Sequence, residues 1–149
     1  MKAVTRLLLI LVGYIAGLTV FFLALSCLFA LGAWLLPHPG YWTGLGLSPV
    51  LFAAAPAAGL FMMLMAAIIS AVPMTLAVVL YEALGWRNPL AYALPAALLA
   101  MGTYISLSPR MLGTPDAAAI AEAALFGLAG LAGGLAYWLM AGRKAGDWR

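Results

Sequence analysis

The chain has 149 residues, of which 67% are hydrophobic and only 7% are charged. Soluble globular domains are about 45–50% apolar and about 25% charged, and disordered chains are poor in apolar residues, so both classes are excluded. Seven Lys or Arg against four Asp or Glu give a net charge of +3. Cations spread this thinly predict no nucleic-acid-binding surface. The composition indicates a membrane protein whose solvent is the lipid bilayer.

Four uncharged segments are each long enough to cross a bilayer as a helix, since about 20 apolar residues span the hydrocarbon core. The sequence therefore predicts an all-α membrane protein with four transmembrane helices in an up-down bundle. Residues 1–149 form a single membrane domain in this interpretation. The predicted spans are approximately 7–36, 57–82, 89–107 and 115–141.

The prolines and glycines between these segments predict where the helices end. Pro37 closes the first span, and residues 41–56 are expected to lie at the membrane surface. An alternative assigns 49–56 to the second span, but the uncharged run would then exceed the thickness of the hydrocarbon. We therefore expect a break near Pro56 and a kink at Pro73, because proline cannot donate a helical hydrogen bond.

Two further helix starts combine a capping side chain with a proline. Asn88 stands before Pro89, and Thr114-Pro115-Asp116 opens the fourth helix with Asp116 placed against its positive end. Both patterns are typical of helix N-termini. Gly85 and Gly142 are expected to stop the second and fourth helices, and the short connection after Gly85 predicts an antiparallel hairpin of spans two and three.

The basic residues predict the orientation. Six of the seven fall on one side of a four-span topology, and Arg110 alone falls on the other. Because Lys and Arg accumulate on the cytoplasmic side, both termini are expected in the cytoplasm. A cleaved signal peptide with a lipoprotein site at Cys27 is the alternative for span one. The residues after Cys27 stay apolar, which favours an uncleaved span.

Small residues form stripes that suit close helix packing in lipid. In span four the stripe includes Gly127, and Gly130 with Gly134 forms a GxxxG pair; in span one Gly13 and Gly17 form another. One interpretation is that the stripes pack the four helices against each other. The other is that the stripe of span four faces a different subunit.

Polar residues inside a membrane are candidates for function. Glu122 could bind a proton or cation in a small transporter, with Ser70 and the Pro73 kink supplying a pathway. The interpretation that we favour is an interfacial acid near the positive end of its helix, paired with Arg110. Ser70 could also bond a carbonyl released by Pro73.

The sequence offers no catalytic, metal-binding or cofactor-binding constellation, so no enzyme and no cofactor is predicted. His38 has no second histidine with which to hold a metal. The methionines near residue 62 alternate with apolar residues and are expected to fill the bilayer span rather than bind copper. Glu82 and Arg87 are expected to be solvated charges at the membrane surface.

The stretch Gly130-Leu-Ala-Gly-Gly-Leu-Ala-Tyr-Trp-Leu-Met-Ala-Gly-Arg-Lys-Ala-Gly resembles the ending of a group of small uncharacterised bacterial inner-membrane proteins with four spans. The resemblance implies a bacterial inner membrane and carries no activity.

Three functional hypotheses follow. The leading one is a non-catalytic accessory or assembly subunit, or a self-associating bundle, whose partners are other membrane subunits or copies of itself. The second is a small oligomeric transporter or channel that uses Glu122. The third is a lipid-acting enzyme with His38, Arg110 and Asp116 on the outer face.

Overall fold

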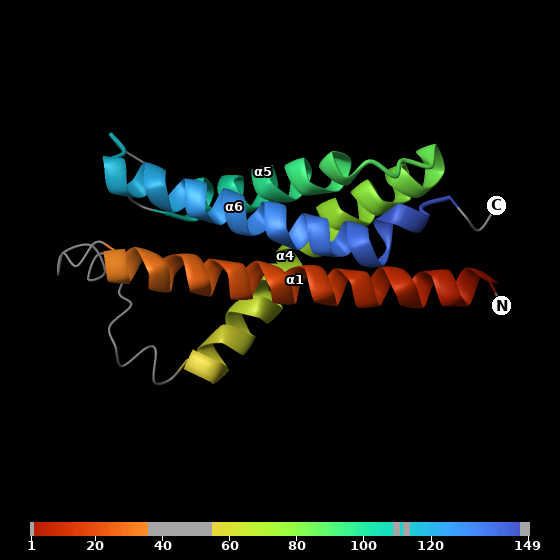
Figure 1. The fold of residues 1–149 in the computed structure, drawn as a ribbon, viewed down its shortest axis with the longest axis horizontal. Coiled ribbons are helices and arrows are strands. Elements are labelled where there is room, and N and C mark those ends of the chain that lie inside the picture. The colour runs from red at the N-terminus through yellow and green to blue at the C-terminus, as the bar shows by residue number, and fades with distance from the viewer. Residues whose placement is uncertain (1, 36–54, 109–110, 112–113, 147–149) are drawn as a thin grey trace.

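A computed structural model describes residues 2–35, 55–108, 111 and 114–146. Within this part of the chain, all of the regular structure is helical (Figure 1). Each of the four long helices is long and apolar enough to cross a membrane, so the predicted class and the four helices are confirmed. They are α1 (Lys2–Leu35), α4 (Ala55–Leu84), α5 (Pro89–Leu107) and α6 (Ala117–Met140), followed by the 3-10 turn η2 (Gly142–Lys144).

The start of α5 at Asn88 follows from local side-chain chemistry, as predicted, and Asp116, expected as an acid at the helix start, is the N-cap of α6. The Asn88 Oδ1 atom accepts a hydrogen bond from the backbone N–H of Leu90 at 3.0 Å. The Asp116 carboxylate accepts one from the N–H of Ala119 at 2.7 Å. Each bond satisfies a donor that has no partner within the helix. Gly85 lies just beyond α4 with a φ of 63°, a conformation that glycine adopts at little cost.

Helix α6 ends close to the expected stop at Gly142, but Gly142 does not have the positive φ that is typical of a glycine after a helix. Helix α6 ends at Met140, and Gly142 opens the turn η2 instead. The positive φ, 79°, belongs to Gly146. Gly142 is required for space rather than for its backbone angles, because a Cβ atom there would lie 2.9 Å from the Tyr92 ring.

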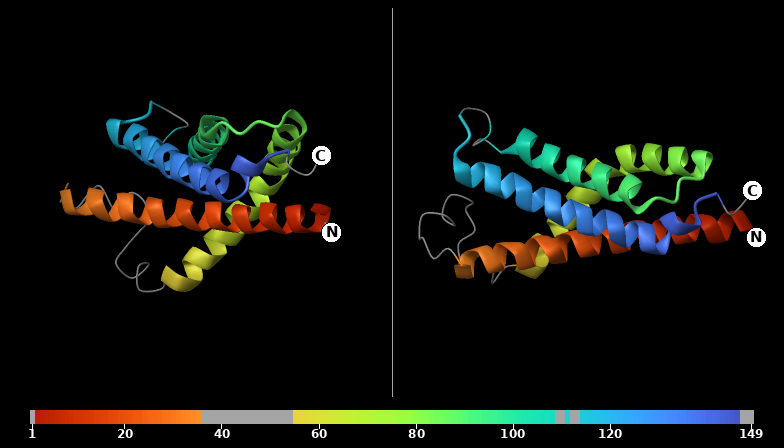
Figure 2. Two further views of the ribbon diagram at one scale, coloured as in Figure 1. Left: turned by 45° about the vertical axis from the view of Figure 1, so that its right-hand side comes forward. Right: turned by 45° about the horizontal axis from the view of Figure 1, so that its top comes forward.

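Helix α6 is the centre of the fold. It packs against α1 on one side and against α5 on another, and these two pairings dominate the contacts between helices. Figures 1 and 2 show the three helices running along one another. The phenyl ring of Phe126 on α6 joins both partners, with its centroid 4.9 Å from that of Tyr104 and 6.4 Å from that of Phe21. A buried core therefore forms around α6.

Helix α4 joins this core through its C-terminal half, where the buried Tyr81 packs with Tyr92 and Tyr137. It crosses α1 obliquely and makes few contacts with it, and its N-terminal half, yellow in Figure 1, projects away from α5 and α6. Pro56 is the second residue of the helix, a position that tolerates proline. The helix continues through Pro73. Most of the predicted surface segment 41–56 lies outside the described residues.

One end of the molecule brings together segments that are far apart in the sequence (Figure 1). The first turns of α1 and the turn η2 meet there, together with the connection between α4 and α5. We call this the terminal end.

Candidate functional site

Backbone contact between α5 and α6 depends on two glycines of the predicted stripe. A Cβ atom on Gly130 would lie 2.6 Å from the carbonyl oxygen of Ala96, and one on Gly134 would lie 2.6 Å from that of Tyr92. Neither position can hold a larger residue without moving a backbone. The stripe residue Gly127 is less confined, because its Cβ would meet Met101 at 3.9 Å.

Contact between α1 and α6 uses the glycines of span one. A Cβ atom on Gly17 would lie 3.0 Å from the carbonyl oxygen of Gly133, and one on Gly13 would lie 3.0 Å from the Cβ of Ala141. The sequence interpretation did not single out Gly133. Gly130 and Gly134 face α5, whereas Gly133 faces α1. Because α6 packs against a helix on each of two sides, it needs a glycine on the second side as well.

The two small-residue stripes therefore pack inside the chain. The interpretation in which the stripe of span four faces another subunit finds no support in these contacts. The two GxxxG pairs also do not meet each other, since that of α6 faces α5 and that of α1 faces a different side of α6.

Glu122 is buried between α5 and α6, with 1% of its surface exposed. The Tyr104 hydroxyl donates a hydrogen bond to its Oε2 atom. The expectation that Glu122 is an interfacial acid is therefore wrong, because its carboxylate is buried between two helices. The expected partner Arg110 lies outside the described residues. The sequence interpretation missed Tyr104, which lies on another helix and gives no local signal.

A second polar contact joins α1 to α4. The Tyr14 hydroxyl donates to the carbonyl oxygen of Ala67 at 2.8 Å and lies 2.8 Å from the Ser70 Oγ atom. Ser70 thus contacts a neighbouring helix. Thr75, near Pro73, donates to the carbonyl of Ala71 within its own helix.

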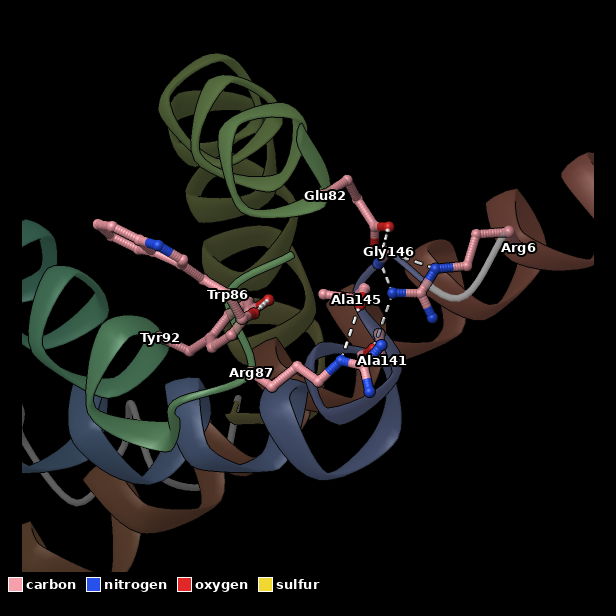
Figure 3. A network of polar contacts seen from close by, with 8 residues as sticks. All are labelled: Arg6, Glu82, Trp86, Arg87, Tyr92, Ala141, Ala145 and Gly146. Atoms are coloured by element: carbon pink, nitrogen blue, oxygen red, sulfur yellow. Dashed lines mark hydrogen bonds and ion pairs between the residues drawn. The ribbon is translucent and has the colours of Figure 1, made fainter. Parts of the chain in front are cut away.

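The largest polar network lies at the terminal end (Figure 3). Arg6 forms an ion pair with Glu82, and the two side chains are 12% and 13% exposed. The Arg6 Nη2 atom also donates to the carbonyl oxygen of Ala141 at 2.9 Å. The second carboxylate oxygen of Glu82 accepts the backbone N–H of Gly146 at 3.0 Å. One carboxylate thus joins α4, α1 and the chain that follows α6.

The connection between α4 and α5 is hydrogen-bonded to the last turn of α6 and to the residues that follow it. The Arg87 Nε atom donates to the carbonyl oxygen of Ala145 at 3.0 Å, and the Trp138 indole donates to the carbonyl of Arg87 at 2.6 Å. The prediction that Glu82 and Arg87 are merely solvated charges is therefore wrong for Glu82 and incomplete for Arg87, whose side chain is exposed but bonded. We call Arg6, Glu82, Arg87 and residues 141–146 the terminal cluster.

Aromatic rings lie directly beneath the terminal cluster. The ring centroids of Tyr81 and Tyr92 are 4.6 Å apart in an edge-to-face arrangement, and those of Tyr92 and Tyr137 are 5.6 Å apart. The Tyr92 hydroxyl donates to the carbonyl of Trp86 at 2.9 Å. A narrow space between α4, α5 and α6 adjoins these rings, and its walls are apolar, aromatic or glycine.

The remaining candidates form no site in the described part of the chain. His38 and Arg110 lie outside the described residues, as do the side chains of Met62 and Met63. Asp116 is the N-cap of α6. Among the described residues, no group of His, Cys, Asp or Glu could hold a metal ion.

No protein-family model, no curated protein and no solved structure matches this chain. Its class therefore rests on its own residues. Four helices that are long and apolar enough to span a bilayer support a multi-pass membrane protein.

Proposed function

We propose that the chain is a non-catalytic accessory subunit of a bacterial inner membrane. The observation that carries this proposal is the placement of polar side chains within the described helices. Arg6 pairs with Glu82, Tyr14 with Ser70, and Tyr104 with Glu122. Each pair joins two helices, and the space between α4, α5 and α6 has apolar walls. Such pairs stabilise an assembly of helices in lipid.

Helix α4 is the element that we propose contacts another membrane-embedded chain. Helices in lipid associate through close packing, because burying apolar groups gives little when the solvent is also apolar. The small-residue faces of α6 and α1 are occupied within the chain. Helix α4 has few such contacts and presents a long apolar face, in which Val72 and Leu76 are 69% and 68% exposed.

Cross-linking tests this role. Cys27 is first replaced by serine, and a single cysteine is placed at Val72 on α4 or, as the control, at Leu98 on α5, which is 63% exposed. The proposal predicts cross-links to another membrane chain from position 72 and none from position 98. A product containing two copies of this chain would assign the contact to self-association. Equal cross-linking from both positions, or none from either, contradicts the proposal.

The proposed topology is up-down with both termini in the cytoplasm, and the bacterial inner membrane follows from the resemblance of the last span. Support for the orientation comes from the basic residues: Arg6, Arg87, Arg143 and Lys144 lie at the terminal end, as the positive-inside pattern requires of a cytoplasmic face. A reporter that is active only in the cytoplasm should be active when fused to either the first or the last residue, and a reporter that is active only outside the cytoplasm should be inactive at both. Reporters on opposite faces would exclude this topology.

A small transporter or channel is the second candidate, and the burial of Glu122 favours it. Acidic side chains inside membrane helices frequently mark ion or proton pathways, and this one is 1% exposed. The chain reconstituted in vesicles would then show a flux that Glu122→Gln abolishes and Ser70→Ala weakens. The accessory-subunit proposal predicts no such flux and a stability change in Glu122→Gln. Enzymatic function is the least supported class, because Asp116 already serves as a helix cap.

A further inference from the structure

The terminal end carries more positive charge than its own acid neutralises. Glu82 is the described acid there, and its two carboxylate oxygens are engaged by Arg6 and by the N–H of Gly146. Arg87, Arg143 and Lys144 are exposed at the same end.

These three cations come from two distant parts of the chain and are brought together by backbone contacts. The Arg87 side chain reaches from the α4–α5 connection to the carbonyl oxygen of Ala145, one residue beyond Lys144 (Figure 3). The Trp138 indole holds the backbone of Arg87 from the other side. The guanidinium of Arg87 is therefore fixed beside the turn that carries Arg143 and Lys144.

Exposed apolar side chains surround this end of the helices. Trp86, in the same connection as Arg87, is 50% exposed, and tryptophan is enriched at the depth of lipid headgroups. The last residues of α4 and α6 and the first of α5 also present apolar surface at this level: Leu84, Leu90, Leu139 and Met140. A ligand bound here would contact the cations with its polar group and the exposed apolar side chains with its hydrocarbon part.

We infer that the terminal end binds the headgroup of an anionic phospholipid through Arg87, Arg143 and Lys144. A phosphate diester suits this arrangement because guanidinium groups recognise phosphate oxygens with paired N–H donors. Basic sites at the ends of membrane helices bind anionic headgroups in this way. The acyl chains of such a lipid extend along the apolar surface of α4 to α6, which a free phosphate ion would not use.

Quenching of tryptophan fluorescence by brominated lipids tests this site on the full chain. The protein is reconstituted in phosphatidylcholine vesicles that contain a minor fraction of brominated phosphatidylglycerol or, in parallel, of brominated phosphatidylcholine. The wild-type chain is expected to prefer phosphatidylglycerol. Each cation at a membrane surface contributes about fivefold in affinity, so Arg143→Gln/Lys144→Gln should lower this preference roughly 25-fold.

Two control variants make the test specific. Lys2→Gln/Arg149→Gln removes the same charge near the two chain ends and should keep the preference within about threefold, since the inferred site does not include these residues. Arg143→Lys/Lys144→Arg keeps the charge and should keep the preference. Circular dichroism in the same vesicles verifies that each variant is folded.

Three results would overturn the inference. One is a wild-type chain without a preference for phosphatidylglycerol. Another is an equal loss in both charge-removing variants, which would indicate a diffuse surface potential rather than a site. The third is loss of the preference on adding inorganic phosphate but not chloride of equal ionic strength, which would indicate a site for the free ion.

Discussion

The α1–α6–α5 core and helix α4 are held in place by different kinds of contact. Both parts must hold apolar helices in an apolar solvent. The core does so by bringing backbones together at Gly17, Gly130, Gly133 and Gly134. Helix α4 is held instead by the buried ring of Tyr81 and by polar contacts at Ser70 and at Glu82. The comparison indicates that the α1–α6–α5 core is closely packed and intolerant of added atoms, while α4 depends on one aromatic contact and on individual polar bonds.

The largest expected effect comes from adding one methyl group to the core. Gly134→Ala would place a Cβ 2.6 Å from a backbone oxygen, so α5 and α6 must separate. We expect a loss of about 3 kcal/mol in the free energy of unfolding, measured by denaturation in mild detergent. Gly102→Ala is the matched control, because nothing lies within 4 Å of its Cβ. It should be neutral or stabilising by about 0.5–1 kcal/mol. Equal effects at both positions would show that α5 and α6 are not in backbone contact.

The next effect concerns the ion pair that fastens α4. Glu82→Gln leaves the Arg6 guanidinium in a site that is 12% exposed without its counter-charge. A loss of about 2–3 kcal/mol is expected, below the range for a fully buried pair. A double-mutant cycle with Arg6→Gln provides the measurement, and the two changes together should cost less than their sum. Strict additivity would mean that the pair contributes no coupling.

The same chemical change in the two regions sharpens the comparison. Tyr104→Phe removes the hydroxyl that donates to the buried Glu122 carboxylate, with an expected cost of about 1–2 kcal/mol. Tyr14→Phe removes the contact with Ala67 and Ser70 at the edge of the core and should cost about 0.5–1 kcal/mol. Thermal unfolding in detergent compares the two. A larger loss at Tyr14 would reverse the proposed ranking of the regions.

The smallest effect is expected on the outward face of α4. Val72 is 69% exposed, so Val72→Ala should change the unfolding free energy by less than about 0.5 kcal/mol. The same variant should weaken cross-linking to a partner if α4 is the contact surface. A substantial loss of stability in the isolated chain would place Val72 inside a packed interface of the chain itself.

Much of the local structure could be predicted because it is encoded by neighbouring residues. The N-caps at Asn88 and Asp116 need only a side chain and the next three residues. The small-residue stripes were also visible, but which helix each one faces depends on the whole arrangement. For that reason Gly133 was missed although Gly134, its neighbour, was not.

The terminal cluster could not be predicted for a similar reason. Arg6 and Glu82 are 76 positions apart in the sequence, and no spacing rule connects them. The same holds for Tyr104 with Glu122, which meet only because α5 and α6 pack together. A glycine after a helix can serve either to adopt a positive φ or to leave space for a neighbouring side chain. The sequence does not distinguish these two roles, and Gly142 has the second, because the Tyr92 ring lies against it.

The contrast between core and α4 is tested most directly by spin-label distances in bilayers. In a Cys27→Ser background, one pair of labels joins Leu98 on α5 to Leu128 on α6, and a second joins Leu98 to Val72 on α4. All three positions are more than half exposed, so the labels disturb little packing. The account predicts a narrow distance distribution for the first pair and a broader one for the second. Equally narrow distributions would contradict it.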